Sequence, residues 1–222
     1  MPWIEATLRG QRVLARARSD GSLAIEGGRV EVRYNAIILV HRTRGGSVVE
    51  RLGWRTDTGS RERAFTVYAQ SGSRWLGVSV PALGGHLGWI AANPLNLVAR
   101  PAMREIHVSL HARRLELLDL GRILLSTSVV IGSPDSPTPA GQFSVDDVVR
   151  YTPSSPAYGI GALALSVGPA GLNWVDWRVA IHGLNDVGRL GGTGSEGCLH
   201  VPTTPLDRLL DVPVGTPVDI VG

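Results

Sequence analysis

The segment Ser195-Glu196-Gly197-Cys198-Leu199-His200 contains the only cysteine of this 222-residue chain, and the pair His182-Gly183 precedes that cysteine by sixteen residues. The histidine follows an apolar run of strand-forming type, Val179-Ala180-Ile181. A free thiol has a pKa near ~8.5 and is mostly protonated at neutral pH, so a reactive cysteine needs a nearby imidazole or a set of backbone donors. We therefore predict that Cys198 is a nucleophile and that His182 is its base.

Composition limits the classes of protein that this chain can form. With 43% hydrophobic residues, the chain can build one large core or two modest ones. All 22 basic residues are arginines, which excludes Schiff-base chemistry, and a single cysteine excludes an internal disulfide. No apolar stretch follows a basic start near Met1, and no window reaches the ~20 apolar residues of a membrane helix. We expect neither a signal peptide nor a membrane span in these residues.

Charge is divided unevenly along the chain. Residues 1–100 hold 14 arginines and 7 acidic residues, a net charge of +7, whereas residues 101–222 hold 8 and 12, a net charge of −4. A basic half can favour an anionic partner, and we predict anionic wall polymers as that partner and no nucleic acid. The alternative is a solvated β surface with scattered arginines, because no run of more than two basic residues occurs.

Short β-branched runs recur between the 28 glycines and 14 prolines, which is typical of a mainly β chain with many turns. Helical periodicity is scarce and is best at residues 205–210. The predicted strands are residues 29–34, 36–41, 65–68, 106–110, 115–120, 122–131 and 177–182.

A domain boundary is expected between residues 93 and 103, where Asn-Pro and Arg-Pro pairs interrupt the apolar pattern. Upstream, Trp75-Leu76-Gly77-Val78 and Gly88-Trp89-Ile90 flank a loop rich in proline, glycine and histidine, a pattern similar to the closing strands of bacterial SH3-like barrels. We predict a small N-terminal β domain, SH3-like and wall-binding, over residues 1–100, and a second domain over residues 104–222.

Four stretches of the second half resemble one family when they are taken together and in order. Ile131-Gly132 is followed by Thr138-Pro139-Ala140-Gly141-Gln142-Phe143, then by Ile181-His182-Gly183, and then by Ser195-Glu196-Gly197-Cys198. With the closing residues 212–218, they resemble the L,D-transpeptidase catalytic domain, or YkuD domain, from about Arg104 to Gly222. The resemblance implies a β-sandwich catalytic domain.

The same resemblance implies a reaction and a location. The cysteine attacks the amide between the third residue and the terminal D-alanine of a peptidoglycan stem tetrapeptide, and an acyl-enzyme forms. The side-chain amine of a neighbouring stem then resolves it into a 3→3 cross-link. No cofactor or metal is implied, and the substrate places the protein in the extracytoplasmic cell envelope.

Site roles follow from the resemblance together with residue chemistry. A ring nitrogen of His182 is expected to bind the carbonyl of Gly183. The amides of Gly197 and Cys198, with Glu196, are expected to form an oxyanion hole, and Ser195 to hydrogen-bond within the loop. The turn that contains Thr138, Pro139 and Gly141 is expected to shape the substrate groove.

The chain departs from the family pattern beside the cysteine. His200 stands where the family usually has arginine, and Val201 where it usually has methionine. A histidine with a pKa near ~6.5 does not replace the fixed charge of arginine at neutral pH, which predicts either a bracing role only or a reduced or pH-dependent activity. Glu196 is expected to raise the thiol pKa if it lies close to the sulfur.

Three other interpretations stay open at this stage. The chain could be a wall-binding protein with a degenerate catalytic domain, or an L,D-carboxypeptidase that uses the same cysteine and histidine. Alternatively, Cys198, His200 and His182 could be three ligands of a zinc ion with an open fourth position.

Overall fold

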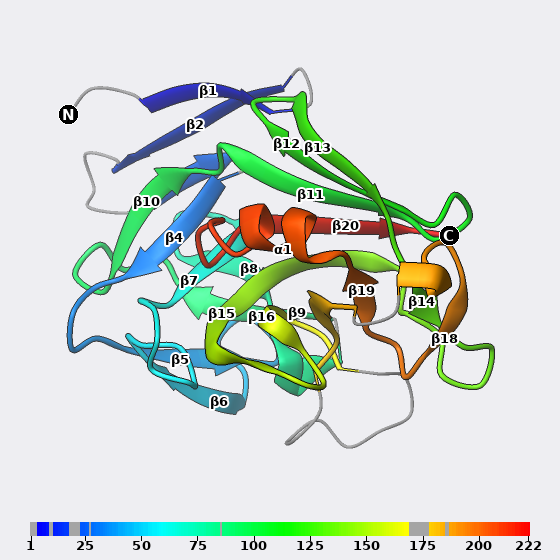
Figure 1. The fold of residues 1–222 in the computed structure, drawn as a ribbon. Coiled ribbons are helices and arrows are strands. Elements are labelled where there is room, and N and C mark those ends of the chain that lie inside the picture. Colours follow the sequence, from blue (N-terminus) through cyan, green and yellow to red (C-terminus); the bar gives the residue numbers. More distant parts are fainter. Residues whose placement is uncertain are drawn as a thin grey trace.

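The computed structural model describes residues 4–8, 11–17, 23–26, 28–84, 86–168, 178–184 and 187–222. These residues form β-strands for the most part, as the turn-rich, β-branched sequence predicts, and the fold class is mainly β (Figure 1). The first three strands form a small antiparallel sheet: β1 (Ile4–Leu8), β2 (Gln11–Ala17) and β3 (Leu23–Glu26).

A seven-stranded sheet follows, with the strand order β10-β4-β7-β8-β9-β5-β6. A 3₁₀ turn, η1 (Pro81–Leu83), precedes β9. Alternate side chains of β4 and their neighbours fill a core of their own, in which Val30, Phe65, Leu76 and Ile90 are fully buried. The strands are β4 (Gly28–Val32), β5 (Ile37–His41), β6 (Val48–Gly53), β7 (Ala64–Ser71), β8 (Trp75–Ser79), β9 (Leu87–Ala91) and β10 (Leu97–Pro101).

The C-terminal half forms an eight-stranded sheet in the order β13-β12-β11-β20-β15-β16-β17-β19. Two pairs, β11 with β20 and β17 with β19, are parallel, and the other pairs are antiparallel. The strands are β11 (Arg104–Ser109), β12 (Arg114–Asp119), β13 (Arg122–Ser128), β15 (Gly141–Ser155), β16 (Gly159–Leu165), β17 (Ala180–Gly183), β19 (Leu199–Val201) and β20 (Pro217–Val221).

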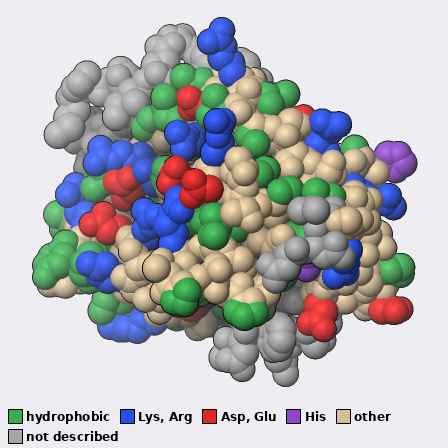
Figure 2. Space-filling view, in the orientation of Figure 1, with side chains coloured by type: hydrophobic (Ala, Val, Ile, Leu, Met, Phe, Trp, Pro, Cys, Tyr) green, Lys and Arg blue, Asp and Glu red, His purple; other side chains and the backbone are tan. Residues whose placement is uncertain are grey.

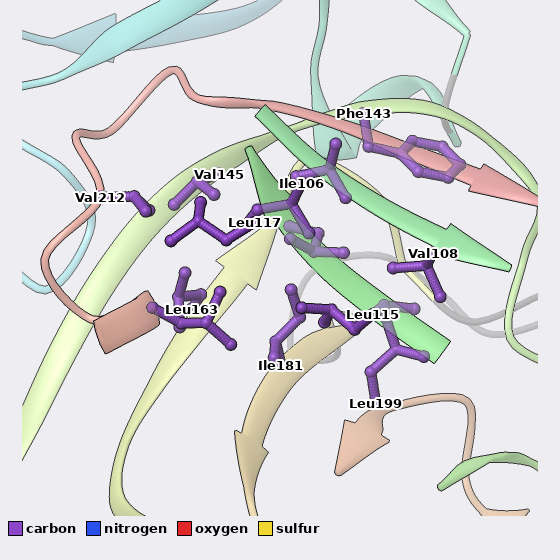
Figure 3. Close-up of a cluster of buried hydrophobic side chains, with 14 of the residues drawn as sticks. Ile106, Val108, Leu115, Leu117, Phe143, Val145, Leu163, Ile181, Leu199 and Val212 are labelled. Carbon is purple, nitrogen blue, oxygen red and sulfur yellow. The ribbon is translucent and has the colours of Figure 1, made fainter. Parts of the chain in front are cut away.

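This sheet folds over its own apolar face, as in a sandwich. Figure 3 shows side chains of β11 and β12, such as Leu115 and Leu117, gathered with Leu163, Ile181 and Leu199 from β16, β17 and β19. Helix α1 (Thr203–Leu209) adds the buried Leu206 and Leu209 to the same core. Burial of a leucine side chain contributes about 1.5 to 3 kcal/mol. This core therefore supports β17 and β19 from behind and leaves their other face available.

Most predicted elements are confirmed, but the boundaries of some differ. Residues 122–131 were expected to form one strand, whereas β13 ends at Ser128 and Ile131 begins the short β14 (Ile131–Gly132), which pairs with β18 (Thr193–Ser195). The chain leaves its hairpin because Val130 exchanges two backbone hydrogen bonds with His200 instead. The predicted helix at 205–210 begins at Thr203, since proline is tolerated in a first helical turn. Trp177, expected to start a strand, lies outside the described residues.

The predicted boundary near residues 100–104 falls between β10 and β11, and the two buried clusters lie mainly on either side of it. The division into two domains and the SH3-like character of the first stay predictions. Hydrogen bonds join the two parts, from the Thr66 hydroxyl to the Gly215 carbonyl at 2.9 Å and from the Ser166 hydroxyl to the Ser79 hydroxyl at 2.7 Å.

Arginines and acidic side chains mix on the surface of the basic half. Figure 2 shows the two colours side by side on the face that carries β4 and β10. Glu31 there forms ion pairs with Arg29 at 2.6 Å and with Arg100 at 2.9 Å. The net positive charge of this half is thus partly paired locally, and binding of an anionic wall polymer stays a prediction.

Candidate active site

A cavity of about 610 Å³ lies over the outer face of β15, β16, β17 and β19. Its lining includes Cys198, His182 and His200, with the small side chains of Ala162, Ala164 and Ala180. Small side chains on three positions of two adjacent strands leave space above the sheet. The cavity is large enough for a peptide segment, since ligand sites in proteins typically span about 300 to 1,000 Å³.

Strand alternation explains why these residues meet. In β17, Ile181 points into the core, so Ala180 and His182 face the cavity; in β19, Leu199 points into the core, so Cys198 and His200 face the cavity. The parallel pairing places His182 beside His200 and Ile181 beside Leu199. Cys198 is therefore level with Ala180, and its side chain is a diagonal neighbour of His182 on one face.

One hydrogen bond fixes the tautomer of His182. Its Nδ1 lies 3.0 Å from the Gly183 carbonyl oxygen, and a carbonyl only accepts, so Nδ1 carries the proton and Nε2 holds the free lone pair. Burial lowers the pKa of this histidine below its usual value of 6.5, against the effect of the Gly183 hydrogen bond. At neutral pH, His182 is thus a neutral imidazole with a base nitrogen available.

Gly183 has a second role, because it lets the β15–β16 hairpin lie close to the histidine. Its amide donates to the carbonyl of Tyr158 at 2.9 Å, and an added Cβ would meet that oxygen at 2.9 Å. The Tyr158 ring contacts the His182 ring edge to face at 5.0 Å between centroids. A side chain at position 183 would displace this hairpin from the site.

The sulfur of Cys198 lies in a mostly buried setting. Burial raises the pKa of the thiol above its usual value of 9.0; a backbone hydrogen bond from Ala180 opposes the rise, and the charge of Glu196 adds to it. The sulfur lies 4.0 Å from the carbonyl oxygen of Arg178, a long contact in which the thiol donates. The resting pair is therefore a neutral thiol and a neutral imidazole.

The turn before Cys198 needs glycine. Gly197 has φ of 99°, a conformation that side chains disfavour, and this sharp turn brings the cysteine to the cavity wall. The Ser195 hydroxyl donates to the carbonyl of Cys198 at 2.6 Å, across the same turn. This hydrogen bond joins the two ends of the turn, with Glu196 and Gly197 between them.

Thr138 lies under this turn and braces it from below. Its buried hydroxyl accepts from the Gly132 amide at 2.9 Å and donates to the Gly197 carbonyl at 3.0 Å. Thr138, Pro139 and Gly141 are absent from the cavity lining, so their positions do not support the predicted role in shaping the groove. The threonine of the T-P-x-G segment links β14 to the turn before Cys198, and the part of this segment in shaping the groove stays a prediction.

We expect Thr138→Val to lower the free energy of unfolding by about 2 to 4 kcal/mol. Valine keeps the shape but removes both hydrogen bonds, and each buried polar group left without a partner costs about 1 to 3 kcal/mol. Chemical denaturation measures the change, with Thr127→Val as the control: its hydroxyl makes an exposed hydrogen bond to Ser128, so a change within about 0.5 kcal/mol is expected. Equal stability of the two variants would contradict the bracing role.

His200 and Glu196 both face the cavity, and neither carries the positive charge that the family pattern has at position 200. Burial, followed by the proximity of His182 and of the Arg189 charge, lowers the pKa of His200 to about 4, so this ring is neutral at neutral pH. It packs against the His182 ring with 4.2 Å between centroids. Its backbone pairs with Val130, and the role of His200 in bracing the loop stays a prediction.

Among the lining residues that sequence reasoning missed are four polar ones from outside the predicted loop: Arg178, Asp57, Thr58 and Asp147. Arg178 could have been found, because positions 178, 180 and 182 alternate along one strand direction and share a face. Asp57 and Thr58 come from the turn after β6, and no local signal connects them to Cys198.

Neither a metal site nor a membrane-spanning helix occurs in the part of the chain that the structure describes. No group of three or more His, Cys, Asp or Glu side chains there is arranged to hold a metal ion, so the zinc interpretation gains no support. No helix within the described ranges is long and apolar enough to cross a membrane.

The fold and the site together define a class of protein: a β-sandwich in which a cysteine and a histidine face one cavity. The model of the L,D-transpeptidase catalytic domain, YkuD, matches residues 103–220, more than half of the chain. The chain belongs to this family.

Solved structures with similarity to this chain carry the same name. An L,D-transpeptidase from Mycobacterium smegmatis is 18% identical over 87% of this chain and 97% of that one, with a TM-score of 0.46. The catalytic domain of the E. faecium L,D-transpeptidase is 26% identical over 54% of this chain and 97% of that one, with a TM-score of 0.40. The Ldtfm-avibactam carbamoyl enzyme is 27% identical over 60% of this chain, which spans about half, 52%, of that protein, with a TM-score of 0.43. No curated protein sequence matches this chain.

Proposed function

We propose that this protein is a peptidoglycan L,D-transpeptidase that forms 3→3 cross-links through a Cys198 acyl-enzyme. The observation that carries the proposal is the placement of Cys198 and the fixed, neutral imidazole of His182 on one face of adjacent strands, over an alanine-floored cavity. Family membership over residues 103–220 supplies the substrate class.

In the first half-reaction, His182 Nε2 takes the thiol proton as the sulfur attacks the carbonyl of the third stem residue. The C–N bond to D-alanine then breaks, and His182 returns the proton to the leaving amine. The positive φ of Gly197 turns the backbone so that the amides of Gly197 and Cys198 can donate to the oxyanion. In the second half-reaction, an acceptor amine attacks the thioester and frees the thiol.

The charge of the cavity wall favours an amine as the acceptor. Glu196 is exposed beside Cys198. Its carboxylate attracts a cationic side chain such as that of a diamino acid, and the neutral His182 can accept the proton of the attacking amine. The envelope location follows from this substrate.

Incubation of the purified chain with disaccharide tetrapeptides is expected to give cross-linked dimers, with one D-alanine released for each dimer. Mass spectrometry of the products distinguishes the possibilities, because transpeptidation adds no water whereas hydrolysis yields a tripeptide that has gained one. Tripeptide as the sole product would make the protein an L,D-carboxypeptidase. Unchanged substrate, with a folded protein, would favour the wall-binding alternative.

A further inference from the structure

We propose that Arg178 is a positioning residue for Cys198 and that Asp57, from the seven-stranded half of the protein, holds Arg178 in place. The proposal rests on the proposed function, in which Cys198 is the nucleophile. It assigns to the N-terminal half a part in the chemistry of the C-terminal half.

The strand segment from Arg178 to Ala180 touches the sulfur at both ends. The carbonyl oxygen of Arg178 lies 4.0 Å from Sγ, and the backbone of Ala180 hydrogen-bonds to the thiol in the sense that lowers its pKa. A shift of this segment therefore changes the surroundings of the reactive atom directly. A backbone amide that donates to a thiolate is a charge-assisted hydrogen bond and outweighs a thiol-to-carbonyl contact.

The side chain of Arg178 is held by carboxylates from both halves. Its Nη1 donates to Asp146 in β15, and its Nη2 donates to Asp57 in the turn after β6. Arginine suits this link better than lysine, because the planar guanidinium presents donors in a fixed fork, whereas the lysine ammonium is one compact charge on a flexible stem. The burial of Arg178 works to lower its pKa, but Asp146 and Asp57 raise it, so the fork stays charged.

Asp57 is itself fixed. Its other carboxylate oxygen accepts from Arg63 at 2.5 Å, and Arg63 is almost fully buried and also donates to the carbonyls of Gly53 and Arg55. Burial works to raise the pKa of Asp57, but Arg63 and Arg178 hold it below its usual value, so the carboxylate stays charged.

Two further contacts attach the same turn to the catalytic sheet. The amide of Thr58 donates to the Asp147 carboxylate at 3.0 Å, and the Ser60 hydroxyl donates to the Val148 carbonyl at 2.9 Å. Residues 57–60 therefore lie against β15 at the edge of the cavity. The path from the buried Arg63 through Asp57 to Arg178 and the sulfur consists of direct contacts throughout.

Charge-conserving substitutions test this role without altering the electrostatics of the cavity. We expect Arg178→Lys to raise the apparent pKa of the thiol, measured from the pH dependence of iodoacetamide alkylation, and to slow alkylation at pH 7 about tenfold, which corresponds to one pKa unit. Release of D-alanine is expected to show a similar fall in kcat with little change in KM. Asp57→Glu, which keeps the charge but not the reach, is expected to act in the same direction.

The matched control is Arg150→Lys. Arg150 also joins two aspartates through Nη1 and Nη2, Asp207 and Asp211, each at 2.8 Å, but on the protein surface. The pH dependence of alkylation in the Arg150→Lys variant is expected to equal that of the unsubstituted protein. If Arg178→Lys behaves like this control, the positioning role is wrong. A rise in KM with unchanged alkylation would also overturn it, because it would show that Arg178 contacts substrate.

Two checks distinguish a loss of folding, and a failure of the proposed function, from a failure of the positioning role. If thermal unfolding shows that Arg178→Lys is not folded, Asp57→Glu decides, and a profile like that of the unsubstituted protein overturns the proposal. If the unsubstituted protein releases no D-alanine, the proposed function fails, while alkylation still reports whether Arg178 sets the thiol pKa.

Discussion

Cys198→Ala is expected to reduce release of D-alanine from a disaccharide tetrapeptide by roughly 10⁴-fold or more, the scale of the loss when a nucleophile is removed from a covalent mechanism. The reason is that Cys198 carries the only thiol of the chain, and the lining hydroxyl nearest to it in sequence, that of Ser195, donates to the Cys198 carbonyl. The measurement is D-alanine release, with the acyl-enzyme mass sought in parallel in the unsubstituted protein.

The fold is expected to survive this change, because the side chain of Cys198 lies at the cavity wall and its contacts are a long one with the Arg178 carbonyl and a hydrogen bond with the Ala180 backbone. A melting temperature close to that of the unsubstituted protein is the control. Turnover that persists in a folded alanine variant would remove the cysteine mechanism, and Cys198→Ser with residual slow turnover would show that a weaker nucleophile in the same place can act.

The sequence predicted the local features of the C-terminal half better than the long-range contacts that support the candidate site. The placement of Cys198 and His182 could be predicted because their spacing and flanking residues are local signals, and strand alternation in and beside β17 and β19 is enough to put both on one face. The hydrogen bond between the His182 ring and the Gly183 carbonyl joins neighbours in sequence, so the family pattern could predict it.

The role of Thr138 and the presence of Asp57 could not be predicted in the same way. Thr138 reaches Gly197 across 59 residues, and Asp57 reaches Arg178 across 121 residues. Such contacts depend on how β14 lies against β18 and how the turn after β6 lies against β15. A turn signature such as T-P-x-G fixes local dihedral angles but does not state which loop the turn will support.

The causes of the pKa shifts of Cys198 and His200 could also be assigned only from the structure. The sequence indicated that Glu196 could raise the thiol pKa, but burial is the larger cause. It likewise indicated that His200 titrates near neutral pH, whereas burial, together with the proximity of His182 and Arg189, lowers the pKa of His200 to about 4. Burial by distant strands is a property of the assembled sheet, and residue type alone does not encode it.

His182→Ala is expected to lower kcat for D-alanine release by roughly 10² to 10⁴-fold, the usual contribution of a positioned general base, and to leave a trace because the backbone donors of the oxyanion hole remain. The pH profile identifies the base. Burial lowers the pKa of His182 below 6.5, so the neutral imidazole persists below that pH, and the acid limb of kcat/KM is expected below pH 6.5 in the unsubstituted protein.

In the alanine variant this limb is expected to vanish, and the residual rate is expected to rise with pH toward the pKa of the thiol, which burial places above 9.0. His111→Ala, an exposed histidine in the β11–β12 turn, is the control and should keep both the rate and the limb. An acid limb at or above pH 6.5 would contradict this prediction, because it would show that burial does not lower the pKa of His182. A limb that survives in His182→Ala would assign it to another group, and His182 would then be no base.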